Sequence, residues 1–269
     1  MLVFLPTPIG NLEDMSLRAL RALNECDTIL CEDTRVAASL LLLLQKRALL
    51  QKRHVRLVSV HAHNEEHFVQ NLAPDFFAQN VVYLSDAGLP CVSDPGAALV
   101  RYAQQNGIAY TVLPGANAAL CAFVASGMGS KEFHFYGFLP HKRQQKEREL
   151  AKLLATGGVV VCYESPHRLI QTLEILDSLG IDDVFAAKEM SKQFESYYRA
   201  SPAALLAQIK QPRGEWTLVL NLKKSAQKEW NLSEFQDLLP PKVLAKIQAR
   251  MSGRSVRECY DSLREEESR

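Results

Sequence analysis

The sequence predicts the α/β fold class, with two α/β domains followed by a small helical extension. Short runs rich in β-branched and aromatic residues alternate with longer helical patterns, which is typical of strands joined by helices. The chain of 269 residues exceeds the usual size of a single hydrophobic core, so two cores are expected.

Residues 1–116 form the first predicted domain. Its helical patterns include Ser16–Asn24 and Pro95–Asn106, and connections of this length between strands favour parallel pairing. Five runs are predicted as its strands: LVFLPT (2–7), TILCED (28–33), RLVSVH (56–61), VVYLSDA (81–87) and AYTVLPG (109–115).

Residues 117–223 form the second predicted α/β domain. Beyond it, the composition changes to lysine, glutamine and glutamate, and Pro240-Pro241 then precedes a helical pattern that continues to Leu263. We therefore expect a helical extension over residues 224–269. The predicted strands of the second domain are FHFYGFLP (133–140), VVVCYES (159–165), VFAAKEM (184–190) and EWTLVLNL (215–222).

Composition excludes several classes of protein. Lys and Arg number 31 against 30 Asp and Glu, so the net charge neither indicates nor excludes a nucleic-acid partner. The six cysteines form no C-x-x-C pair, which argues against a disulfide framework or a cysteine zinc site. No apolar run reaches the ~20 residues of a membrane helix, and the amino terminus has no basic leader. We expect a cytoplasmic protein with no membrane segment.

Polar and glycine-rich motifs follow the predicted strands of the first domain. Ligands of open α/β sheets bind beyond the carboxyl ends of the strands, so these motifs predict a binding cleft. Each motif also has a purely structural interpretation: Gly10 or Gly115 can simply serve a turn, and Asp94-Pro95-Gly96 can simply start a helix. Neither the phosphate loop of ATPases nor the G-x-G-x-x-G of dehydrogenases is present. The motifs are TPIGN (7–11), EDTR (32–35), HAHNEE (61–66), SDAGLPCVSDPG (85–96) and PGANA (114–118).

Residues 63–67, HNEEH, match the H-x-x-E-H pattern of a class of zinc peptidases. A zinc site would need both histidines on one helix face and a further protein ligand. The alternatives are that Asn64 and Glu65 start a helix with His67 on its solvent side, or that His61, His63 and Asn64 line the cleft. We predict no metal.

Several longer blocks occur in a characteristic order over nearly the whole chain. They are TPIGNLEDMSLRAL, CEDTR, HAHNEE, SDAGLPCVSDPG, PGANA, GFLP, YESPHRL, AKEMSKQFE, RGEWTLV, PPKVLAKIQARMSG and ECYDSL. In this combination the sequence closely resembles the ribosomal small-subunit RNA methyltransferase I family of the tetrapyrrole methylase superfamily. It departs from the family pattern at Cys91, where glycine is usual, at Ala116-Asn117, where proline and serine are common, and in an expanded segment at 40–54.

The resemblance implies two domains of the tetrapyrrole methylase (class III methyltransferase) type with S-adenosylmethionine bound in the cleft between them. It further implies a homodimer and 2′-O-methylation of a cytidine ribose in the decoding region of 16S rRNA, with free rRNA or the small ribosomal subunit as partner. Alternatives are a methyltransferase acting on a tetrapyrrole or another small molecule, and a non-catalytic RNA-binding assembly factor.

Three groups of site residues follow from the resemblance together with the strand-end positions. Donor binding is assigned to Pro8, Gly10, Asp86, Gly88, Leu89, Pro90, Ser93, Asn117, Ala118, Tyr163, Gly214 and Glu215. Proton acceptance and acceptor binding are assigned to Glu32, Asp33, Arg35, His61, His63 and Asn64, with the base among them left open. RNA contacts are assigned to Arg35, Lys142, Arg143, His167, Arg168 and Lys188, with His141, Lys146 and Arg148 as further basic side chains. A surface ion pair of Asp33 with Arg35 and a turn-capping Asp86 are the structural alternatives.

Overall fold

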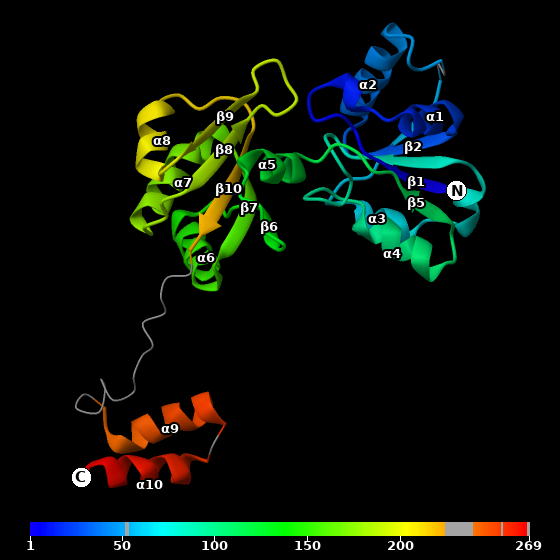
Figure 1. The fold of residues 1–269 in the computed structure, drawn as a ribbon. Coiled ribbons are helices and arrows are strands. Elements are labelled where there is room, and N and C mark those ends of the chain that lie inside the picture. Colours follow the sequence, from blue (N-terminus) through cyan, green and yellow to red (C-terminus); the bar gives the residue numbers. More distant parts are fainter. Residues whose placement is uncertain (52–53, 224–238, 254, 268–269) are drawn as a thin grey trace. The chain divides into compact units, whose positions relative to one another are not determined.

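The computed structural model describes residues 1–51, 54–223, 239–253 and 255–267. The chain divides into two compact units, Met1–Lys223 and Lys224–Arg269, and the first contains two five-stranded sheets (Figure 1). Residues 52–53 of the expanded segment and residues 224–238 of the predicted extension lie outside the described residues. Within the described part of the chain, no helix has the length and apolar character needed to cross a membrane.

The first sheet is entirely parallel, with the strand order β3-β2-β4-β1-β5. Each strand lies within a run predicted from the sequence. Because parallel strands end at the same edge, the polar segments after β1, β2, β3 and β4 meet there. The strands are β1 (Leu2–Leu5), β2 (Thr28–Cys31), β3 (Arg56–Ser59), β4 (Val81–Leu84) and β5 (Tyr110–Val112).

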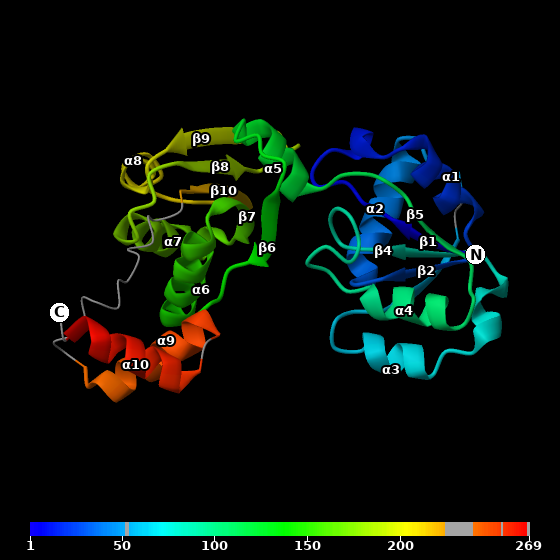
Figure 2. The same cartoon turned by 60° about the horizontal axis from the view of Figure 1, so that its bottom comes forward.

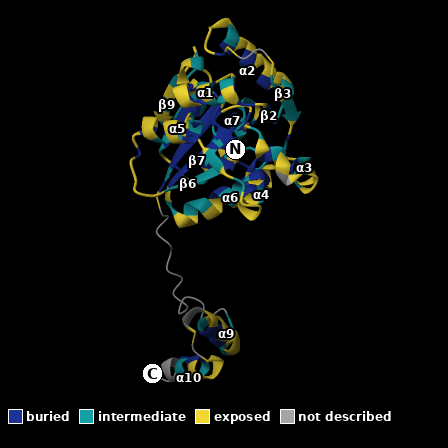
Figure 3. Cartoon of the chain, turned by 90° about the vertical axis from the view of Figure 1, so that its right-hand side faces the viewer, coloured by how far each residue is buried: buried dark blue, intermediate teal, exposed yellow. Residues whose placement is uncertain are grey.

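Helices cover both faces of the first sheet. Val3 and Leu5 pack in a core with residues of α1 and α2, whereas Leu2 and Phe4 pack in a second core with residues of α3 and α4. This division follows from the two-residue period of a strand, and Figure 3 shows the resulting dark blue strands beneath helices with yellow outer faces. The helices are α1 (Leu17–Glu25), α2 (Thr34–Lys46), α3 (Glu65–Gln70) and α4 (Ala97–Gln105), with short 3₁₀ turns at Leu12–Asp14 and Pro74–Ala78.

The second sheet is mixed and has the order β6-β7-β10-β8-β9. Its pairs are antiparallel except for β6 with β7. One face packs against α6, α7 and α8, and the other against α5, which follows the connection from β5 (Figure 2). The strands are β6 (Phe133–Phe138), β7 (Gly158–Glu164), β8 (Val184–Lys188), β9 (Ser196–Ala200) and β10 (Trp216–Leu222), and the helices are α5 (Ala118–Ser126), α6 (Arg143–Thr156), α7 (Pro166–Ser178) and α8 (Pro202–Gln208).

Strand β9 is absent from the sequence-based prediction. It is an edge strand of five residues in which half-buried and exposed side chains alternate. Its stabilising contacts come from other strands: the preceding strand β8 pairs with it along its length, and the ring of Tyr198 lies 5.8 Å from that of Trp216 at the start of β10. A local pattern of five residues does not contain this information.

The described residues of the second unit contain two packed helices, α9 (Pro241–Ser252) and α10 (Val256–Glu267). Leu244, Ala245 and Ala249 of α9 bury their side chains against Cys259 and Leu263 of α10. Gly253 ends α9 in the left-handed conformation, with φ of 71°, which is the usual helix stop for glycine. The helical pattern predicted after Pro240-Pro241 therefore forms a helical hairpin.

Candidate active site

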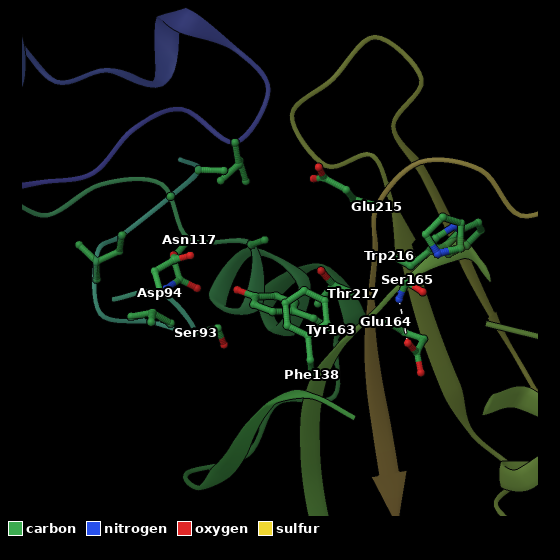
Figure 4. A pocket seen from close by; sticks show the side chains of 17 residues that line it. Ser93, Asp94, Asn117, Phe138, Tyr163, Glu164, Ser165, Glu215, Trp216 and Thr217 are labelled. Atoms are coloured by element: carbon green, nitrogen blue, oxygen red, sulfur yellow. Dashed lines mark hydrogen bonds between the residues drawn. The ribbon is translucent and has the colours of Figure 1, made fainter. Parts of the chain in front are cut away.

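A cavity lined by residues of both sheets' ends lies in the first unit and has the size of a small-molecule site. Its volume is about 390 Å³, within the range of ~300–1,000 Å³ that is usual for such sites, and both sheets contribute to its wall (Figure 4). The wall consists of Ile9 after β1, Ala87–Leu89 and Val92–Asp94 after β4, Asn117 and Ala118 at the start of α5, Phe138 at the end of β6, Tyr163–Pro166 at the end of β7, and Glu215–Thr217 at the start of β10.

The loop from β4 to α4 forms one side of the cavity and is held at both ends. At its beginning, Thr7 and Gly88 exchange backbone hydrogen bonds of 2.9 and 3.1 Å. At its end, the Glu65 carboxylate accepts hydrogen bonds of 2.8 Å from the backbone N–H groups of Gly96 and Ala98. These two anchors fix the middle of the loop against the cavity.

The backbone of this loop is strained. Cys91 and Ser93 both have φ of 67°, a left-handed conformation that costs a residue with a side chain about 1–2 kcal/mol. Glycine adopts that conformation without strain, so both positions would suit glycine better than a residue with a side chain. Strained backbone of this kind is concentrated at ligand sites.

The start of α5 and the end of β7 form the floor. The Asn117 side chain caps α5 by accepting a hydrogen bond of 3.0 Å from the Leu120 N–H. The Tyr163 ring lies 5.4 Å from the ring of Phe138. Aromatic and polar side chains thus lie together at this part of the wall, among them Phe138, Tyr163 and Asn117 (Figure 4).

A buried charged network supports the end of β7. The Lys146 ammonium group, fully buried on α6, donates hydrogen bonds of 2.7 Å to the Glu164 carboxylate and 2.6 Å to the Thr172 hydroxyl. The other Glu164 oxygen pairs with Arg168 at 2.8 Å and accepts from the Ser165 N–H at 2.8 Å. The network therefore fixes Ser165, which lines the cavity.

Three carboxylates with raised pKa values lie at the carboxyl edge of the first sheet. Burial and then the charge of Asp86 raise the pKa of Glu32. Burial raises the pKa of Asp86, although its carboxylate accepts a hydrogen bond of 3.2 Å from the Asp33 N–H. Burial, with Glu32 and Asp86 adding repulsion, raises the pKa of Asp94 to about 7. This edge of the sheet is thus acidic, and these three carboxylates are stronger proton acceptors than usual. Of the three, Asp94 lines the cavity.

Asp33 and Arg35 form the surface ion pair considered as an alternative above. Asp33 caps α2 by accepting from the Arg35 N–H at 2.8 Å, and the two side chains lie 2.6 Å apart. Hydrogen bonds from Arg35 lower the pKa of Asp33 to about 2, which makes its carboxylate a weak base. Next to them, Asn64 accepts from the His61 N–H at 2.7 Å, and His61 Nδ1 accepts from the His63 N–H at 3.3 Å.

The HNEEH motif has a structural role. Glu65 caps α4, Glu66 pairs with Arg101 at 2.7 Å, and His67 is exposed on α3. In the described ranges, no three His, Cys, Asp or Glu side chains are grouped so as to hold a metal ion.

The matches to known proteins agree with this architecture. The family of tetrapyrrole (corrin/porphyrin) methylases matches residues 1–205. A protein named Ribosomal RNA small subunit methyltransferase I from Helicobacter pylori strain 26695 is 42% identical, and the match covers 97% of this chain and 96% of that protein. The chain belongs to the ribosomal RNA small subunit methyltransferase I family of tetrapyrrole methylases. The family resemblance and the fold class predicted from the sequence are confirmed.

Other members of the methyltransferase I family cover the chain as fully. The protein of the same name from Campylobacter fetus is 40% identical over 98% of this chain and 99% of its own. Among solved structures, this chain is similar to a uroporphyrin-III C-methyl transferase from Thermus thermophilus complexed with S-adenyl homocysteine. The TM-score is 0.54 at 19% sequence identity, and the match covers 82% of this chain and 96% of that protein. That structure shares the fold.

The predicted donor residues divide into two groups. Gly88, Leu89, Ser93, Asn117, Ala118, Tyr163 and Glu215 line the cavity, whereas Pro8, Gly10, Asp86, Pro90 and Gly214 do not. Gly10 and Gly214 instead lie against the segment after β8: a side chain on Gly10 would meet Lys192, and a Cβ on Gly214 would lie 2.5 Å from the Glu189 carboxyl carbon. Ile9 and Ala87 lie in the predicted donor loops, between Pro8 and Gly10 and between Asp86 and Gly88. The other residues of the wall were not predicted: Val92, Asp94, Phe138, Glu164, Ser165, Pro166, Trp216 and Thr217. For Asp94, Phe138 and Ser165, the motifs SDPG, GFLP and YESP were the available signal.

The predicted RNA-contact residues also differ in exposure. His141, Lys142, Arg143, Arg148 and His167 are exposed near the amino ends of α6 and α7, and Arg35 is 89% exposed. Lys188 is half-buried. The structure corrects the prediction that Lys146 is a basic side chain available to RNA. Its side chain is fully buried because it neutralises Glu164, so it cannot reach a phosphate. Arg168 is 14% exposed and its guanidinium group is held by Glu164 and the Leu139 carbonyl.

Proposed function

We propose that this chain transfers a methyl group from S-adenosylmethionine to the 2′-hydroxyl of a cytidine in the decoding region of 16S rRNA. The observation that carries the proposal is the 42% identity, over nearly the full length of both chains, to a protein named Ribosomal RNA small subunit methyltransferase I. The S-adenyl homocysteine bound by the Thermus thermophilus relative of the same fold supports the choice of donor.

The cavity fits such a donor in size and chemistry. At about 390 Å³ it can enclose a nucleoside-sized ligand, with aromatic surface from Phe138 and Trp216 and polar groups from Asn117 and Tyr163. The donor contacts are proposed for the seven predicted residues that line it. The five others, Pro8, Gly10, Asp86, Pro90 and Gly214, would position the loops that carry them. When bound, S-adenosylmethionine supplies an electrophilic methyl carbon.

Proton removal is proposed for the acidic carboxyl edge of the first sheet. In the transfer, the acceptor oxygen bonds to the methyl carbon, the carbon–sulfur electron pair returns to sulfur, and the hydroxyl proton leaves to a base. Among the predicted residues, Glu32 is the proposed base because its pKa is raised, whereas that of Asp33 is lowered to about 2. His61, His63, Asn64 and Arg35 would then orient the ribose. Positioning can remove ~7–11 kcal/mol of barrier, more than a general base, which adds ~10²–10⁴ in rate.

RNA binding is proposed for the exposed basic side chains. Lys142, Arg143 and His167 lie at the amino ends of α6 and α7, and Arg35 adds a cation next to Asp33. Lys188 is retained as a further contact, whereas Arg168 is proposed to position Ser165 through Glu164. The partner would be 16S rRNA, free or in the small ribosomal subunit, and the compartment the cytoplasm.

A homodimer is proposed from the resemblance and from the outer face of α5. Leu120 and Val124 on this face are 50% and 77% exposed. Adjacent exposed apolar side chains of this kind mark association surfaces.

The test is transfer of labelled methyl groups from S-adenosylmethionine to small ribosomal subunits that lack the modification, followed by nuclease mapping of the label. Label on the ribose of a single cytidine is the expected result. Label on a base would refute the 2′-hydroxyl as acceptor. Absence of label on subunits and on free rRNA, with the donor bound, would favour a small-molecule acceptor or a non-catalytic assembly factor.

A further inference from the structure

Asp94 lines the cavity but has no structural partner. It precedes α4, and its sequence context, Asp94-Pro95-Gly96, is typical of a residue that caps a helix. The cap is nevertheless supplied by Glu65, whose carboxylate accepts hydrogen bonds from the Gly96 and Ala98 N–H groups. Within the described ranges, no hydrogen bond or ion pair joins the Asp94 carboxylate to another side chain. Its carboxylate is therefore available to a ligand.

The surroundings of Asp94 disfavour its negative charge. It shares the cavity wall with the apolar side chains of Leu89, Val92 and Phe138. The ionisable groups that act on it or on which it acts are Glu32, Asp86, Tyr83, Cys91 and Tyr163, and none of them is a cation. A partly buried carboxylate without a protein cation is stabilised when a ligand brings a positive charge.

We propose that Asp94 is a specificity-determining residue that recognises the positive charge of a sulfonium donor and so distinguishes it from the thioether product. This inference rests on the proposed function. S-Adenosylmethionine carries a sulfonium cation in addition to its amino and carboxylate groups. Once the carbon–sulfur electron pair returns to sulfur, S-adenosylhomocysteine has a neutral sulfur and no net charge. Ionised Asp94 therefore attracts the donor and loses that attraction when the product forms.

The experiment is isothermal titration calorimetry of both ligands with the full chain at pH 8, where Asp94 is mainly ionised. For Asp94→Asn we expect the Kd of S-adenosylmethionine to rise about tenfold, as for the loss of one partly screened charge pair, while the Kd of S-adenosylhomocysteine changes less than about twofold. Ser93→Ala is the matched control, because Ser93 lines the same wall without a charge. It should change the two affinities by similar factors.

Equal losses for both ligands in Asp94→Asn would overturn the inference, because they would place Asp94 at a group that donor and product share, such as the amino group. Unchanged affinities for both ligands would overturn it as well. If the wild-type chain bound neither ligand, the proposed function would fail first and this inference with it. If both ligands bound and only the charge preference were missing, the proposed function would stand alone.

Discussion

Replacing Asp94 with asparagine is expected to stabilise the folded chain without ligand, and to do so more at pH 8 than at pH 5. Burial and the charges of Glu32 and Asp86 raise the pKa of Asp94 from 3.8 to about 7. The folded chain therefore holds this proton more tightly than the unfolded chain does. The stability that accompanies the protonated carboxyl is complete below pH ~4 and is lost as the pH rises through 7.

The size of the effect follows from the shift. Three pKa units correspond to about 4 kcal/mol, of which about two thirds is lost between pH 5 and pH 8. Asp94 is only partly buried, and water screens its charge, so we expect about 1 kcal/mol. Asparagine keeps the shape of the side chain and removes the charge. The gain in unfolding free energy of Asp94→Asn should therefore be about 1 kcal/mol larger at pH 8 than at pH 5.

Urea unfolding at the two pH values measures this difference, provided that the denaturant slope is unchanged by the substitution. Asp75→Asn is the control, because Asp75 is exposed and lies outside the cavity. Its effect should be the same at both pH values. A gain for Asp94→Asn that does not depend on pH, or a loss of stability at pH 8, would refute the reasoning.

Three further substitutions test other parts of the structure. Lys146→Met should lower the unfolding free energy, measured by urea unfolding, by about 3–5 kcal/mol because it leaves buried Glu164 without its main cation. Adding Glu164→Gln should recover part of this loss. Full stability of the single variant would contradict the proposed role of the network. Gly214→Ala should lower the Tm, because φ is 75° and the new methyl group would meet Glu189; an unchanged Tm would show that the segment adjusts freely. Val124→Asp should convert the proposed homodimer to a monomer in light scattering, and a dimeric variant would exclude the α5 face as the contact.

The sequence predicted the fold well where the pattern is local. Of the strands in the described residues, nine fall within predicted runs, apart from Gly158 at the start of β7. The six central ones, β1, β2, β4, β7, β8 and β10, are recognisable because buried central strands are nearly continuous apolar segments. The exception, β9, has no continuous buried run: half-buried and exposed residues alternate along it. Its place in the sheet depends on pairing with β8 and on the contact of Tyr198 with Trp216, which lies later in the chain. The loops after the strands were equally accessible to prediction, because a sheet brings its carboxyl ends together.

Individual side chains in the site were harder to predict because their roles depend on long-range pairing. Asp94 has the local sequence of a helix cap, and only the fold shows that Glu65 occupies that role. Lys146 lies in a charged helix that is mostly exposed, and its burial depends on Glu164, 18 positions further along the chain. In both cases the local sequence suggests a common role, a helix cap for Asp94 and a solvated cation for Lys146, but a residue distant in the sequence determines the actual role.

The loop from β4 to α4 contains both the strained, destabilising residues and the residues proposed to bind the donor. Two strained residues, Cys91 and Ser93, and an unpaired carboxylate, Asp94, lie between the anchors at Gly88 and Gly96. Strain and an unpaired charge both disfavour folding, so the anchors must hold a conformation that the loop alone would not adopt. A loop held in this way loses little conformational entropy when a ligand binds, and the ligand's positive charge offsets part of the electrostatic cost. The strain and the unfavourable charge in this loop are therefore consistent with a preorganised binding site for the proposed donor.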